Sequence, residues 1–233
     1  MHVYAEILES AIHIYGGEHD GKYFDLPLAK GTSCKVPQII LLANTRTAII
    51  RTCHPLSADA APTAPWHAIR ASFPFGESLN ENTHVFDGTN FANSEGQECY
   101  LMAALPIPIA ENIAANAASL FGKHKLQCLN TIEFMAFKHF CTSGANSLWV
   151  IFSQDDGVRI LNIIDGLPHS TFNISNNKNH NIIELAAFTN NKKTASTRAV
   201  ILHKYESELS WIAQLLTEHN IPLQHAGFSS IFK

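Results

Sequence analysis

The sequence predicts an α/β fold in two similar halves, each with a mixed β-sheet and flanking helices. The clearest signal is in residues 97–175, which alternate as strand, helix, strand, helix and then two or three strands. Tight turns are marked by Asp155-Asp156-Gly157 and by Asp165-Gly166. Each half begins with a strand meander and continues into helix–strand–helix, which is typical of an internally duplicated fold. We expect antiparallel pairing within each meander and parallel strands after each helix.

The first half is expected to cover residues 1–141. Short apolar segments between turn residues predict its strands, at residues 2–7, 11–15, 22–26, 37–43, 48–53, 83–87, 97–105 and 126–129. The strand at 83–87 is expected to pair with residues 100–104. Helices are expected from Pro65, over 109–121 and over 130–140. In the 109–121 helix, which ends before Gly122, an apolar stripe contains Ile109, Ile113, Leu120 and Phe121.

The second half is expected to cover residues 142–233, after a hinge near Thr142-Ser143-Gly144. Its strands are predicted at residues 148–152, 158–164, 170–174, 199–203 and 221–226. Helices are predicted near 181–188 and over 206–219. The second of these has an amphipathic face of Leu209, Ile212, Leu215 and Leu216. Residues 173–193 are rich in asparagine, which indicates a solvated insertion.

Composition limits the classes of function. The 233 residues are 46 % hydrophobic and only 15 % charged, which supports a packed core and suggests a surface partly covered by contacts. The net charge of −4 argues against a general nucleic-acid binder. We find no apolar run long enough for a membrane span and no signal peptide. The five cysteines form no C-x-x-C pair, and Cys53, Cys99 and Cys128 are expected to be buried, reduced thiols in a cytoplasmic protein.

No motif indicates catalysis or a metal site. The thirteen histidines give no H-x-x-x-H or H-E-x-x-H spacing, and no G-x-S-x-G is present. A Cys–His dyad stays open, because its two members need only be close in space. We therefore expect no enzyme activity, no cofactor and no metal. Three aromatic residues, Trp66, Trp211 and Phe228, are candidates for partner contacts if they are exposed.

Five segments together resemble a known family in the order of their elements: residues 37–53, 66–75, 83–87, 97–140 and 148–166. They resemble the actin-like (ribonuclease H-like) cytoplasmic domain of type II secretion system protein L and of the type IV pilus assembly protein PilM. Phe73-Pro74-Phe75 followed by Val85-Phe86-Asp87 is similar to one passage of this family. Residues 126–131, leading into a Phe-rich helix, are similar to its link between subdomains. The resemblance implies two actin-like subdomains with a cleft between them.

The phosphate loops depart from the members of this family that bind ATP. Such loops need an acid, a glycine and small hydroxyl residues, because glycine lets backbone N–H groups approach the phosphates. The first candidate loop contains Glu6 and Glu9 but no glycine. The second keeps Gly157 but places Asp155 and Asp156 beside it. Carboxylates repel a triphosphate, so we expect weak ATP binding or none.

The resemblance then implies a non-catalytic scaffold on the cytoplasmic side of an inner-membrane platform. Its expected partners are the secretion or pilus-assembly ATPase and a membrane-platform protein of the same machine. Related proteins either continue into a membrane helix or bind the tail of a small membrane partner in a groove. A homodimer is also open. The alternatives are an actin-like ATP-binding protein and an unrelated α/β protein-binding module.

Overall fold

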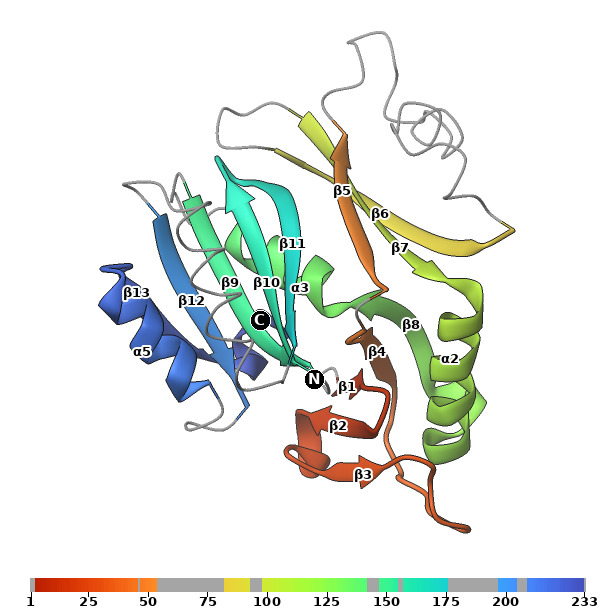
Figure 1. Ribbon diagram of the computed structural model, residues 1–233. Helices are drawn as coiled ribbons and strands as arrows, with labels where there is room; N and C mark the ends of the chain where they lie inside the picture. The colour runs from red at the N-terminus through yellow and green to blue at the C-terminus, as the bar shows by residue number, and fades with distance from the viewer. Residues whose placement is uncertain are drawn as a thin grey trace, which may run out of the picture. The chain divides into compact units, whose positions relative to one another are not determined.

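The computed structural model describes residues 3–45, 47–53, 82–92, 98–141, 147–154, 157–175, 197–204 and 209–232. The chain forms two compact units, Met1–Phe134 and Met135–Lys233. Residues 142–146, which include the expected hinge, lie outside the described residues. Figure 1 shows the elements of both units.

A five-stranded mixed sheet forms the centre of the first unit, in the order β3-β2-β1-β4-β8. Its strands are β1 (Val3–Ile7), β2 (Ala11–Tyr15), β3 (Tyr23–Asp25), β4 (Ile39–Ala43) and β8 (Leu126–Thr131). The first three form an antiparallel meander, while β4 and β8 add in parallel beside β1. This pairing is the expected one. A short 3-10 helix, η1 (Gly17–His19), lies between β2 and β3.

Helix α2 (Ile107–Phe121) packs on this sheet through one apolar stripe. Ile113, Leu120 and Phe121 are buried, and they join a core with the alternate residues of β1, β2 and β4. Ile109 is only partly buried against that core, so the stripe is centred slightly away from the predicted one. The helix ends at Gly122, whose φ of 87° is a conformation that glycine adopts without strain.

A second, three-stranded sheet is inserted between β4 and α2, in the order β5-β7-β6. Its strands are β5 (Ile49–Cys53), β6 (His84–Ala92) and β7 (Glu98–Pro106). The predicted pairing of residues 83–87 with 100–104 is confirmed, because Phe86 lies opposite Ala104. Strand β6 continues to Ala92, however, five residues past the predicted end of the strand at residue 87. They extend the ladder because β7 is long enough to pair with them.

The second unit repeats the topology of the first. Strands β9 (Ser147–Gln154), β10 (Gly157–Ile164) and β11 (Leu167–Ser175) form an antiparallel meander. Strands β12 (Thr197–His203) and β13 (Leu223–Gly227) add in parallel, which gives the order β11-β10-β9-β12-β13. The two sheets therefore share one strand order, as the duplication predicts.

Helix α5 (Ser210–Glu218) packs against the second sheet with its predicted apolar face. Leu209, Ile212, Leu215 and Leu216 are all buried in a core with Trp149 and other residues of the sheet. Residues 205–208 and the predicted helix near 181–188 lie outside the described residues. The described residues also form α3 (Ile132–Phe140) after β8 and two short 3-10 helices, η2 (Lys123–Lys125) after α2 and η3 (Phe228–Phe232) after β13. Among the described helices, none is both long and apolar enough to cross a membrane.

One expectation about the cysteines is wrong. Cys128 is exposed, because it lies on β8 at the edge of the described sheet, where only Thr131 of the strand is buried. Cys34 is buried instead, in the segment between β3 and β4. Burial raises the pKa of the Cys34 thiol above its ordinary range, and the nearby charge of Lys22 offsets part of this effect. The side chains of Cys53 and Cys99 lie outside the described residues.

Candidate functional site

The β1–β2 turn, where the resemblance places the first phosphate loop, is closed tightly. The N–H of Leu8 donates to the carbonyl of Ala11 at 2.9 Å, and Glu9 is exposed at the tip. Glu6 is fully buried on β1. Its carboxylate accepts hydrogen bonds from the Tyr15 hydroxyl at 2.8 Å and from the Asn44 amide at 2.5 Å. Glu6 therefore joins β1 to the loop that follows β4, through donors that belong to the protein itself.

A hollow of about 260 Å³ lies beside this turn. Its polar lining comes from Glu9, Asn44 and Thr45 at the ends of β1 and β4, and from Asn112 and Asn116 on α2. The two α2 amides bond to each other, with Asn116 Nδ2 donating to Asn112 Oδ1 at 2.7 Å. Within the described residues this lining contains a carboxylate and no lysine or arginine. Such a set of side chains does not favour a triphosphate.

The second candidate loop connects β9 to β10. Gly157 is the first residue of β10 and lies opposite Gln154, the last residue of β9. Asp155 and Asp156, the two residues between them, lie outside the described residues.

The aromatic candidates for partner contacts are placed as follows. Trp66 lies outside the described residues. Trp211 is half-buried and packs against the core of the second unit. Phe228 is only 2 % exposed, its ring meets Phe232 edge-on, and the Lys204 ammonium lies 5.4 Å from its centroid. Phe228 therefore does not meet the condition of exposure on which its candidacy depended, because η3 turns its side chain into the protein.

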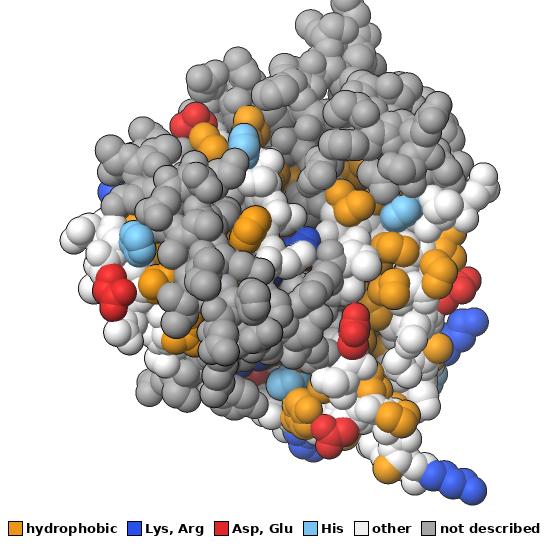
Figure 2. Space-filling view, in the orientation of Figure 1, with side chains coloured by type: hydrophobic (Ala, Val, Ile, Leu, Met, Phe, Trp, Pro, Cys, Tyr) orange, Lys and Arg blue, Asp and Glu red, His pale blue; other side chains and the backbone are white. Residues whose placement is uncertain are grey.

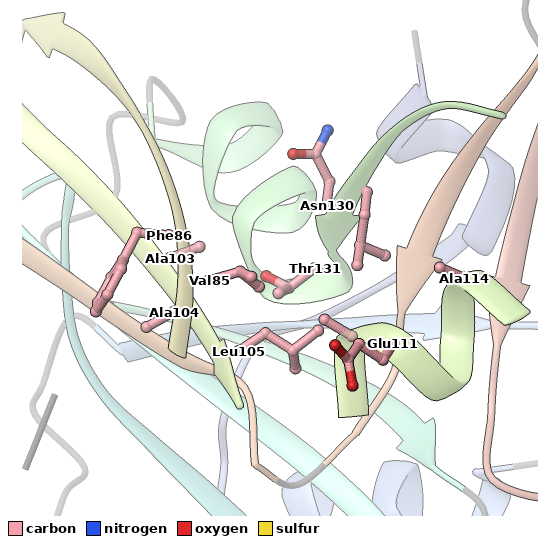
Figure 3. Close-up of a pocket in the computed structure, with 11 residues that line it drawn as sticks. Val85, Phe86, Ala103, Ala104, Leu105, Glu111, Ala114, Asn130 and Thr131 are labelled. Carbon is pink, nitrogen blue, oxygen red and sulfur yellow. The ribbon is translucent and has the colours of Figure 1, made fainter. Parts of the chain in front are cut away.

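A different feature of the first unit has the character of a binding site. It is an apolar groove of about 350 Å³, which we call the β6–α2 groove (Figure 3). Four elements contribute to it. Its lining consists of Val85 and Phe86 from β6, Ala103, Ala104 and Leu105 from β7, Ala110, Glu111 and Ala114 from α2, and Leu129, Asn130 and Thr131 from β8.

Small residues create this groove. Four of the lining residues are alanines, on two facing elements, so β7 and α2 approach without filling the space between them. Val85 at the margin is 42 % exposed, which is high for a large apolar side chain. In Figure 2 hydrophobic side chains gather on the side of the first unit where β6 and α2 lie. An exposed apolar concavity of this kind usually marks a contact site.

The polar groups of the groove are few and have simple roles. Thr131 caps the start of α3, because its Oγ1 accepts the N–H of Phe134 at 3.2 Å. Asn130 Nδ2 is directed to the sulfur of Cys128 at 3.9 Å, a weak contact. Glu111, exposed on α2, is the one charged residue that the described part of the chain contributes to the lining. The groove thus suits noncovalent binding of apolar side chains, with one carboxylate available to a cation at its margin.

The described residues contain no group of three or more His, Cys, Asp or Glu side chains that could hold a metal ion. No family model matches the chain, and no curated protein matches it by sequence.

Solved structures do match the chain. A structure described as a PilM–PilN type IV pilus biogenesis complex aligns with a TM-score of 0.60 at 12 % identity, over 98 % of this chain and 89 % of that one. A Bacteroides thetaiotaomicron protein of unknown function, described as having an actin-like ATPase fold, aligns with a TM-score of 0.51 at 6 % identity, over 97 % and 90 %. The chain has the actin-like ATPase fold. The cytoplasmic domain of EpsL, an inner-membrane component of the type II secretion system of Vibrio cholerae, also aligns, with a TM-score of 0.50 at 10 % identity, over 94 % of each chain.

These matches confirm the predicted actin-like fold class and support the resemblance at the level of fold. Within the first unit, the β6–α2 groove lies where the inserted β5–β7–β6 sheet meets helix α2 and strand β8 of the five-stranded sheet.

The groove was not predicted from the sequence. Two signals pointed toward it: the dense alanines of the 109–121 helix and the apolar pair Val85-Phe86 beside a polar segment. Taken alone, the alanines indicate only that the helix can pack closely on a neighbour. The position of the groove also depends on how β6 pairs with β7. This pairing places Val85 opposite Leu105, so that both residues lie in the same part of the sheet.

Proposed function

We propose that the chain is a non-catalytic scaffold of a type IV pilus or type II secretion inner-membrane platform, at its cytoplasmic face. In this proposal it docks a membrane-platform protein and the assembly or secretion ATPase of the same machine. The fold is consistent with this role, since two of the matched structures are described as parts of such machines.

The observation that carries the proposal is the β6–α2 groove. Its apolar lining and the carboxylate of Glu111, the one charged side chain among its described residues, suit a short apolar segment with a lysine or arginine beside it. We infer that this segment is the cytoplasmic tail of the membrane-platform partner. One matched structure is itself a complex of PilM with PilN.

The phosphate-loop region supports a role without nucleotide chemistry. The β1–β2 turn is closed over Glu9 without glycine, and the hollow beside it has amide and carboxylate lining. Glu6 is engaged by Tyr15 and Asn44 as a structural link. A catalytic phosphate site would instead need backbone N–H groups and cations directed at the ligand.

Co-purification tests the proposal. The full chain is combined separately with the cytoplasmic tail of the cognate platform protein and with the N-terminal domain of the cognate ATPase. Retention of either partner at tens of micromolar protein and low salt is the expected result. Retention of neither would overturn the scaffold proposal and favour an unrelated protein-binding module.

A further inference from the structure

A second hollow of the first unit lies at the far end of α2, away from the β6–α2 groove. It has a volume of about 590 Å³, and we call it the α2-end hollow. Its walls are the segment Ser33–Val36 and the last turn of α2 with the residues that follow. Figure 1 shows the loop after β3 beside this end of α2.

Local hydrogen bonds hold these walls. Gly122 ends α2, and the N–H of Lys125 donates to the carbonyl of Gly122 at 3.0 Å, which forms the 3-10 helix η2 (Lys123–Lys125). The N–H of Cys34 donates to the carbonyl of Leu120 at 2.8 Å. His19 Nε2 lies 2.7 Å from the carbonyl oxygen of Lys35, which ties the segment to η1.

The rim of this hollow is positively charged, although the whole chain carries a net charge of −4. Lys35 and Lys125 line it together with His124, and Lys123 adjoins them. No carboxylate of the described residues contributes to the lining. Lys35, Lys123 and Lys125 form no ion pair with a described carboxylate.

Two negative influences oppose this charge, and neither cancels it. The C-terminus of α2 is equivalent to about −0.5 charge, against three lysine charges. Glu18 and Asp20 lie on or beside η1, which a hydrogen bond of His19 joins to the Lys35 carbonyl, but neither of them lines the hollow. The rim therefore keeps an excess of positive charge.

The floor of the hollow is apolar. Cys34, Val36, Leu120 and Phe121 line it and are each buried to more than nine-tenths. The hollow thus combines an apolar floor with a basic rim, within the range of about 300–1,000 Å³ that ligand sites usually have.

We propose that the α2-end hollow binds a short acidic segment of a protein partner. Carboxylates of that segment meet Lys35 and Lys125, and an apolar side chain covers the floor beside Cys34. The concave shape favours a peptide over a membrane surface, because a bilayer could contact the rim lysines without reaching the floor. The proposal does not depend on the scaffold function.

The test uses the full chain and a labelled hexapeptide of sequence Glu-Glu-Leu-Glu-Glu-Leu, followed by fluorescence anisotropy at low salt. The same peptide with glutamine in place of glutamate is the neutral control. We expect the acidic peptide to bind and Lys35→Glu or Lys125→Glu to weaken it by about fivefold or more. Lys138→Glu, at an exposed position on α3, makes the same charge change and should weaken it by less than about twofold.

Alkylation of cysteines provides a second measurement, made at pH about 9.5, where Cys34 begins to react while most lysines keep their charge, and read residue by residue with mass spectrometry. Bound peptide should slow the reaction of Cys34 and leave that of exposed Cys128 unchanged. The proposal is overturned by equal binding of the glutamine peptide, by no binding at all, or by an equal effect of Lys125→Glu and Lys138→Glu. Binding to phosphatidylglycerol vesicles with no protection of Cys34 by peptide would assign the rim to a membrane instead.

Discussion

Filling the β6–α2 groove should weaken docking strongly without unfolding the chain. Ala114 is a half-buried residue on α2 that lines the groove (Figure 3). The groove has a volume of only about 350 Å³ and so admits few partner side chains. A phenyl ring at this position occupies part of that volume. If one apolar anchor of the partner is displaced, the lost burial is about 2 kcal/mol, which corresponds to about thirtyfold in affinity. Anisotropy titration of a labelled cytoplasmic tail of the cognate platform protein measures this loss for Ala114→Phe.

The neighbouring residue supplies a matched control. Ala115 is exposed on the same helix and does not line the groove, so Ala115→Phe adds the same ring outside it. This control should bind the tail within about twofold of the wild type, and both variants should melt within a few degrees of it. Equal losses in the two variants, or tight binding by Ala114→Phe, would show that the tail does not occupy the groove.

Three further predictions concern other parts of the chain. Asn44→Ala removes a hydrogen-bond donor from the buried Glu6 carboxylate and should lower the free energy of unfolding by about 1–3 kcal/mol. Glu9→Ala, at an exposed position, should change it by less than about 0.5 kcal/mol. Urea denaturation measures both changes. Iodoacetamide near neutral pH should modify exposed Cys128 well before Cys34, because burial and a raised pKa keep Cys34 a protonated thiol. The reaction of Cys34 should increase only at alkaline pH. Mass spectrometry after timed labelling measures the order, and labelling of Cys34 first would contradict it. Calorimetry with Mg-ATP should show no micromolar binding, which would correspond to about −8 kcal/mol, and a clear micromolar isotherm would reverse our interpretation of the phosphate loops.

The order of the elements could be predicted from the sequence because local patterns determine it. Alternation of apolar residues between turn residues located the strands of both meanders, and Gly122 located the end of α2. The parallel pairing of β8 and of β13, each of which follows a helix, was predicted from the rule that helix crossovers join parallel strands.

The sites could not be predicted in the same way, because side-chain exposure depends on the neighbours of each element. Phe228 follows a glycine near the chain end, a context that gave no sign of burial, yet η3 packs it inside. Cys128 lies in an apolar pattern, yet its strand is at the edge of the described sheet. The groove arises where residues far apart in the sequence, such as Val85 and Thr131, line the same space.

The position of the β5–β7–β6 sheet has a consequence for how this protein can diversify. In the first unit the chain between β4 and α2 covers residues 44–106, whereas the corresponding link between β12 and α5 covers only residues 204–209. The sheet is therefore an insertion into one copy of a repeated scaffold, attached at the end of β4 and at Pro106. Both faces of this sheet can change in sequence, length or curvature while the five-stranded core of each repeat stays the same. Under the proposed function, the side of the β6–α2 groove that Val85 and Phe86 supply can thus vary without change in the core of the first unit.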